Sequence, residues 1–91
     1  MDFPIALKGY CRVCGYFNDD GFLPWGENGL APSYGFCPCC NAEWGFDDFD
    51  AWTISECRAR WIAEGAKWSS RRRKPDGLTT YERLKRIGVE I

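Results

Sequence analysis

Two Cys-x-x-Cys pairs are the residues of this 91-residue chain whose type and spacing point most directly to chemistry. Each pair is followed by a residue that tolerates positive φ, Gly15 or Asn41, as a tight turn around two thiolates requires. We call residues 11–15 the first hook and residues 37–41 the second hook. Two such hooks supply the four ligands of one tetrahedral metal site. The expected ligands are Cys11, Cys14, Cys37 and Cys40.

The ligand set predicts a structural metal but not its identity. Four thiolates suit zinc or a single iron ion equally well. Cys39 is adjacent to Cys40 and is an alternative ligand, but the Cys-x-x-Cys frame, stiffened by Pro38, favours Cys40. Four protein ligands leave no position for substrate or water, and the chain has no histidine, the commonest general base. We therefore expect no enzyme activity.

Six cysteines in a short chain also allow a disulfide framework. The sequence has no apolar run of about 20 residues and no signal peptide at residues 1–4, so we expect a cytoplasmic protein. In that reducing compartment the paired hooks favour metal over disulfides. Cys57 has apolar neighbours at helical spacing and is expected to be a small core residue.

A chain of 91 residues makes one domain, with barely enough apolar surface for a core that is stable without help. Zinc held by four thiolates contributes about 10 to 16 kcal/mol to folding at neutral pH, as much as the whole stability of a small domain. We expect a single domain over residues 1–91, with metal-binding hairpins in residues 1–50 and a helical, basic part in residues 51–91. The metal-free chain should be largely unfolded.

Short extended segments must position the hooks. Residues 5–10 predict a strand that enters the first hook, and residues 16–17 leave it, which together indicate a hairpin. Residues 34–36 and 42–46 flank the second hook in the same way. The loop between them is rich in proline and glycine and is expected to be ordered around Trp25.

Two helices are expected after the hooks. Thr53 and Glu56 have the spacing of a capping box, which predicts a helix over residues 54–64 that ends at Gly65. Its apolar stripe consists of Ile54, Cys57 and Trp61.

The capping-box spacing recurs near the C-terminus. Thr79 and Glu82 predict a second short helix over residues 80–87 that ends at Gly88. Its expected apolar positions are Tyr81, Leu84 and Ile87. The expected fold is a small α+β domain in which one or two C-terminal helices cover two metal-binding hairpins of the rubredoxin or zinc-ribbon kind.

Charge is divided unevenly along the chain. Residues 1–50 carry two basic and eight acidic side chains, and residues 51–91 carry ten basic and five acidic ones. The acidic group is either a solvated turn or a face that binds a basic protein such as a nuclease toxin. It consists of Glu43, Asp47, Asp48 and Asp50.

The basic run has two interpretations as well. It is either a solvated surface that balances the chain's own acids, which the net charge of −1 favours, or a contact for nucleic-acid phosphates. Its members are Arg71, Arg72, Arg73 and Lys74. The aromatic residues, 16% of the chain, are expected mostly in the core, with Trp68 beside the basic run as the most exposed tryptophan.

Two families resemble this pattern. The hooks in residues 10–16 and 37–40 resemble those of rubredoxins, a resemblance that implies iron and single-electron transfer. Residues 10–65 are similar to small bacterial cysteine-rich proteins with Cys-Pro-x-Cys hooks and a following aromatic and acidic segment, here residues 43–48. That resemblance implies a rubredoxin-like or zinc-ribbon fold. Because such proteins often occur beside toxin genes, it also implies a role as an inhibitor or immunity protein.

The expected function is therefore a zinc-stabilised protein-interaction module, such as an inhibitor or immunity protein of a bacterial toxin. The alternatives are a rubredoxin-like electron-transfer protein with a single iron, and a nucleic-acid-binding zinc ribbon.

Overall fold

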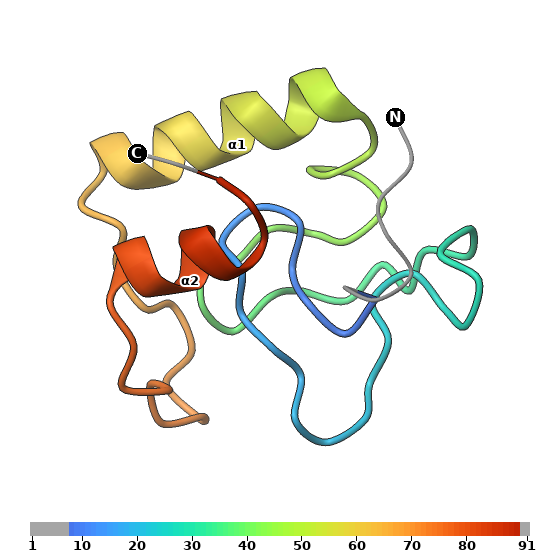
Figure 1. Ribbon diagram of the computed structural model, residues 1–91, viewed down its shortest axis with the longest axis horizontal. Helices are drawn as coiled ribbons and strands as arrows, with labels where there is room; N and C mark the ends of the chain where they lie inside the picture. The colour runs from blue at the N-terminus through green and yellow to red at the C-terminus, as the bar shows by residue number, and fades with distance from the viewer. Residues whose placement is uncertain (1–7, 90–91) are drawn as a thin grey trace.

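The computed structural model describes residues 8–89, which form a small unit with two helices and irregular chain. Helix α1 spans Ala51–Ala63 and helix α2 spans Thr80–Arg86. Figure 1 shows α1 along one side of the molecule and α2 apart from it, with turns and loops making up the rest. Part of the strand expected over residues 5–10 lies outside the described residues. Neither helix in the described part of the chain is long and apolar enough to cross a membrane.

Extended pairing within residues 8–89 is limited to two isolated antiparallel bridges, which link Tyr10 to Phe17 and Phe36 to Glu43. Each bridge encloses one hook. Among the described residues no longer ladder extends from either bridge, so the backbone does not establish rubredoxin or zinc-ribbon hairpins.

Helix α1 begins three residues earlier than the sequence predicts. The N-cap is Asp50, whose carboxylate accepts a hydrogen bond from the Thr53 amide at 2.8 Å, while the Thr53 hydroxyl accepts from the Asp50 amide at 2.9 Å. Thr53 is therefore the third helical residue, and the predicted capping box with Glu56 is wrong. The predicted end is confirmed, because Gly65 follows the C-cap with φ of +102°.

Helix α2 agrees closely with its prediction. Thr79 is the N-cap, and its hydroxyl and the Glu82 carboxylate form the expected reciprocal hydrogen bonds. Leu84 is fully buried, whereas Tyr81, expected on the apolar face, is 51% exposed. The helix ends one residue before the predicted boundary, and Gly88 follows with φ of +82°.

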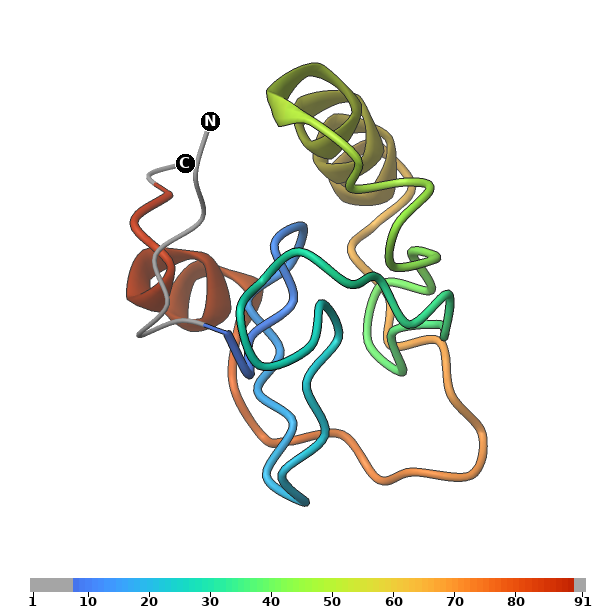
Figure 2. The same ribbon diagram turned by 90° about the vertical axis from the view of Figure 1, so that its right-hand side faces the viewer.

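Both helices contact the first hook, which lies between them in two perpendicular views (Figure 1, Figure 2). Arg58 of α1 donates hydrogen bonds to the carbonyls of Arg12 and Val13, both at 2.8 Å. Arg86 of α2 donates to the carbonyl of Gly15, also at 2.8 Å. The helices therefore hold the hook backbone from two sides, and the buried core gathers around the cysteines. Its other members include Val13, Tyr16, Ala42, Trp44, Cys57 and Trp61.

Candidate metal centre

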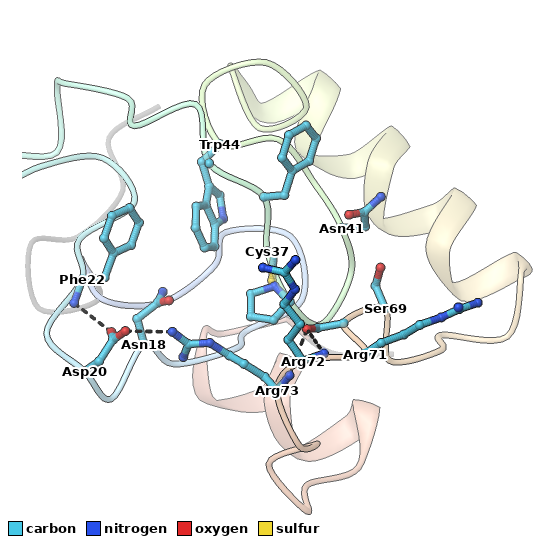
Figure 3. A pocket seen from close by; sticks show the side chains of 14 residues that line it. Asn18, Asp20, Phe22, Cys37, Asn41, Trp44, Ser69, Arg71, Arg72 and Arg73 are labelled. Carbon is cyan, nitrogen blue, oxygen red and sulfur yellow. Dashed lines mark hydrogen bonds and ion pairs between the residues drawn. The ribbon is translucent and has the colours of Figure 1, made fainter.

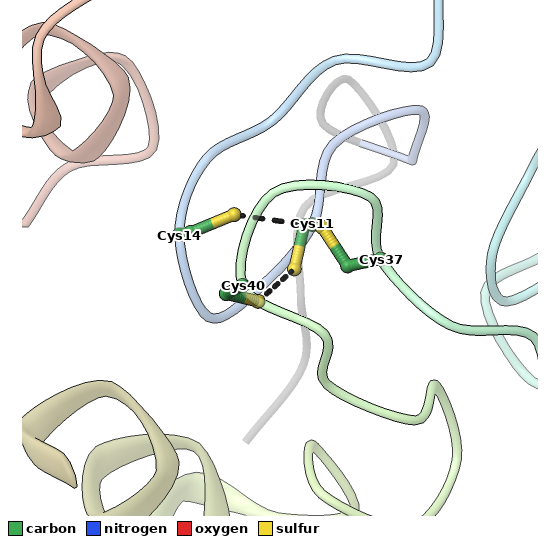
Figure 4. Close-up of side chains that lie close together, drawn as sticks. All are labelled: Cys11, Cys14, Cys37 and Cys40. Carbon is green, nitrogen blue, oxygen red and sulfur yellow. Dashed lines mark hydrogen bonds between the residues drawn. The ribbon is translucent and has the colours of Figure 1, made fainter. Parts of the chain in front are cut away.

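The four predicted ligands converge on one point. The Sγ atoms of Cys11, Cys14, Cys37 and Cys40 all lie within 4.8 Å of one another and are buried (Figure 4). The Cys11–Cys40 and Cys14–Cys37 sulfur pairs are 3.7 and 3.6 Å apart. Four sulfurs placed tetrahedrally, each about 2.3 Å from a zinc ion, would be separated by about 3.8 Å. The cluster therefore has the size of a single tetrahedral metal site, and the pairs are too far apart for disulfide bonds.

The backbone of the two hooks is arranged in the same way. The amide of Cys11 donates to the carbonyl of Tyr16 at 2.8 Å, and the amide of Cys37 donates to the carbonyl of Ala42 at 2.9 Å. The residue after each pair has positive φ as predicted, +84° at the glycine of the first hook and +64° at the asparagine of the second. The two hooks are therefore near-equivalent turns that each present two sulfurs to the centre.

The remaining cysteines stay outside the cluster. Cys39 is fully buried but is not one of the four grouped sulfurs, so the preference for Cys40 agrees with the geometry. Cys57 is a buried residue of α1, as expected, and burial raises its pKa to about 11. It is therefore a protonated thiol at neutral pH. All six cysteines are free of disulfide bonds.

Arg58 of α1 brings a positive charge near the cluster. A divalent metal with four thiolates carries a net charge of −2, and burying such a charge requires compensation nearby. Burial lowers the pKa of the Arg58 guanidinium, while Cys11 and Cys14 act in the opposite direction. Arg58 thus provides a partly buried cation that also ties α1 to the first hook.

A buried donor beside the cluster also fits a bound metal. The indole N–H of Trp44 is buried and has no hydrogen-bond partner among the described residues. Burial raises the pKa of Cys11, but the neighbouring thiols of Cys14, Cys37 and Cys40 and the Trp44 indole favour its thiolate, and the pKa is lowered overall. A metal-bound thiolate is a stronger acceptor than a neutral thiol. The donor set and this unpaired N–H therefore both suit a metal–thiolate centre.

The acidic group expected to bind a partner is largely used within the chain. Asp48 has no exposed surface, and its carboxylate accepts from the Trp25 indole N–H at 2.8 Å and from the Gly45 amide at 2.6 Å. Burial raises the pKa of Asp48, and these two hydrogen bonds oppose the rise. The expectation that Asp48 contacts a partner is therefore wrong. It joins the loop around Trp25 to the exit of the second hook.

The other acidic residues also shape this segment. Asp47 accepts a hydrogen bond from the amide of Glu43 at 2.9 Å, and Asp50 caps α1. Asp50 remains exposed, whereas Glu43 and Asp47 are half-buried. The group fixes the turn between the second hook and α1, and its role in binding a partner stays untested for these three residues.

The members of the basic run differ in their surroundings. Arg73 forms an ion pair with Asp20 at 2.9 Å and donates to the Tyr16 hydroxyl at 3.2 Å. Arg71, Arg72 and Lys74 are exposed. Only part of the run therefore balances the chain's own acids.

Trp68, expected to be the most exposed tryptophan, is half-buried against the core. Its indole N–H donates to the carbonyl of Arg73 at 3.0 Å, and its ring meets Tyr16 edge-on at 5.5 Å. Trp52, which is 71% exposed, is the exposed tryptophan instead. The sequence did not single out Trp52, which lies just before the start of the predicted helix over residues 54–64. It did not single out Arg58 either, because no local pattern marks an arginine whose side chain reaches a distant hook.

Comparison with protein-family models gives no match, and neither a curated protein nor a solved structure matches the chain. The function is therefore inferred from the site itself.

We expect Asp48→Asn to lower the free energy of unfolding by about 1–3 kcal/mol. Two donors, the Trp25 indole and the Gly45 amide, face this carboxylate, and an amide offers one acceptor oxygen and directs its NH₂ group at the other donor. Urea denaturation of the metal-loaded proteins measures the change. Asp19→Asn is the control because Asp19 is exposed, and it should change stability by less than about 0.5 kcal/mol. Equal stability of the two variants would contradict this role.

Proposed function

We propose that this chain is a zinc-stabilised interaction module that binds a protein partner, as an inhibitor or immunity protein does, and that its metal has a structural role. The observation that supports the structural role is the closed cluster of four buried sulfurs. A metal with four thiolate ligands has no free position for substrate or water. This proposal favours zinc over iron because the proposed role needs no electron transfer. Zinc is redox-inactive, and in small domains a four-thiolate zinc site serves to stabilise the fold.

The proposed contact surface lies on the segment that joins the second hook to α1. Phe46, Phe49 and Trp52 are 69%, 67% and 71% exposed, and we call these three side chains the aromatic patch. Exposed aromatic side chains gathered in one segment are typical of protein interfaces, where such residues are enriched. Asp48 accepts a hydrogen bond from the Gly45 amide, and Asp50 accepts one from the Thr53 amide. These bonds fix the backbone that carries the aromatic patch.

A shallow cleft of about 370 Å³ accompanies the patch. Phe46 and Phe49 line it together with Glu56, Cys57 and Arg60 of α1. An apolar side chain of the partner fits between these rings and the helix. Because a few buried aromatic residues supply most of the binding energy in protein complexes, the two phenylalanines should dominate the affinity.

The double variant Phe46→Ala/Phe49→Ala tests this surface. Loss of two dominant contacts weakens binding by at least about 2 kcal/mol, or roughly 30-fold. The wild-type protein would be used to capture partners from its own host, and each candidate would then be purified and titrated calorimetrically against both forms. A 1:1 complex that weakens by this factor supports the proposal.

Leu30→Ala is the matched control, because Leu30 is 78% exposed but does not line this cleft. Its affinity for the partner should equal that of the wild type. A purified partner that binds the double variant as tightly as the wild type would contradict the aromatic patch as the contact surface.

A further inference from the structure

A second, larger cleft lies on a different part of the molecule, between the second hook and the basic run (Figure 3). Its volume is about 610 Å³, within the range typical of small-ligand sites. Figure 3 shows the arginines of the run on one side of the cleft and the rings of Phe22 and Trp44 on the other. None of its lining residues belongs to the cleft beside the aromatic patch. We propose that this cleft binds a nucleotide unit of single-stranded nucleic acid.

The charged wall of the cleft attracts anions. Arg71 and Arg72 are exposed, and their guanidinium groups make no hydrogen bond or ion pair with any described residue. The carboxylate that lines the cleft, Asp20, is already paired with Arg73 at 2.9 Å. Two uncompensated positive charges therefore remain to contact phosphates, and guanidinium groups suit phosphate oxygens because they donate two parallel hydrogen bonds.

The opposite wall offers flat apolar surface. Phe36 and Phe22 line the cleft and are 60% and 43% exposed, and the Phe22 ring lies 5.7 Å from that of Trp44. Aromatic side chains stack on nucleobases, which contributes about 1–3 kcal/mol per base and tolerates any sequence. The combination of phosphate-binding and base-stacking groups at one cleft is what a single strand requires, whereas a duplex hides the faces of its bases.

The basic wall is preformed against the second hook. The amide of Ser69 donates to the carbonyl of Cys39 at 3.0 Å, and the amide of Ser70 donates to that of Pro38 at 2.8 Å. The Ser70 hydroxyl then accepts hydrogen bonds from the amides of Arg72 and Arg73, both at 3.1 Å. The turn that carries the arginines is thus fixed before a ligand arrives, which reduces the entropy lost on binding.

Polar groups in the cleft are free to contact a base edge. The side-chain amide of Asn41 and the hydroxyl of Ser69 line the cleft and make no hydrogen bond to the described chain. An amide and a hydroxyl each donate and accept, so they can contact any base without strong selection. We therefore expect binding with weak sequence preference.

The test uses the metal-loaded full chain and fluorescence anisotropy with labelled eight-nucleotide U and dT strands between 50 and 200 mM salt. Saturable binding of at least one strand is expected, and the two strands show whether RNA or DNA is preferred. Arg71→Glu/Arg72→Glu should weaken binding at least tenfold and reduce the salt slope by about 1.4, since each lost phosphate contact accounts for about 0.7. Phe36→Ala should weaken binding about 5- to 150-fold through lost stacking and leave the slope unchanged.

Two matched controls separate this site from general charge attraction. Lys67→Glu/Lys85→Glu makes the same change of charge at exposed positions outside the cleft, and Leu30→Ala removes an exposed apolar side chain outside it. Both should bind as the wild type does, with unchanged metal content and circular dichroism in every variant. The proposal is overturned by absence of saturable binding at 50 mM salt, by equal weakening in the charge control, or by an unaffected Phe36→Ala variant. Equal affinity for a duplex of the same length or for free UMP would also overturn it.

Discussion

Removing the metal should unfold this protein. The four clustered cysteines form the centre of the buried core, and the helices around them have 13 and 7 residues. Isolated helices of this length are marginal in water, so tertiary contacts with the hooks must stabilise them. A structural metal contributes about 10 to 16 kcal/mol, more than such a core can replace. Titration with a strong chelator should abolish the far-ultraviolet helical signal, and adding zinc back should restore it.

Adjacent cysteines provide a sharp comparison for the same prediction. Cys40→Ser removes one of the four grouped sulfurs and should release the metal at chelator concentrations that the wild type withstands. Cys39→Ala removes a fully buried thiol outside the group and should keep one metal per chain, with only the modest loss of stability expected for a small core truncation. Metal retention by the Cys40 variant, or metal loss by the Cys39 variant, would show that the ligand set is wrong.

Gly15→Ala should destabilise the metal-loaded protein by about 2–5 kcal/mol. Two effects add at this position. A Cβ at Gly15 would collide with the carbonyl of Arg83 in α2, and the backbone has φ of +84°, which L-residues with a Cβ adopt at a cost. Thermal unfolding of zinc-loaded protein measures the change.

Gly21→Ala separates these two effects. Gly21 has nearly the same φ, +86°, but a Cβ there would have no neighbour within 4 Å. Gly21→Ala should therefore lower the free energy of unfolding by about 1–2 kcal/mol, which is the cost of the backbone conformation alone. The difference between the variants reports the contact of the first hook with α2. If both variants lose the same stability, that close contact is absent in solution.

Local sequence patterns predicted the features that are set by residues close together in the sequence. The spacing of the cysteines identified the clustered sulfurs, and the residues after each pair have the positive φ that was expected. The ends of both helices follow from glycines at residues 65 and 88 for the same reason. The start of α1 was misplaced because Asp50–Thr53 and Thr53–Glu56 both have capping-box spacing, and only the folded chain shows which pair is used.

Interactions between distant residues could not be predicted in this way. Asp48 finds the indole of Trp25, 23 positions away, and Arg58 reaches the carbonyl of Val13, 45 positions away. A local run of acidic residues looks the same whether its carboxylates face solvent or fold back on the chain. For that reason the acidic segment was interpreted as a binding face, although its Asp48 is a buried structural residue.

The central claim, a structural zinc held by four cysteines, is tested most directly by metal analysis and X-ray absorption on protein purified from its own host. We predict one zinc per chain, surrounded by four sulfur atoms at about 2.3 Å. One iron per chain with visible thiolate charge-transfer bands and a reversible one-electron couple would contradict this account and indicate electron transfer. Fewer than four sulfur ligands, or no metal in folded protein, would contradict the site itself.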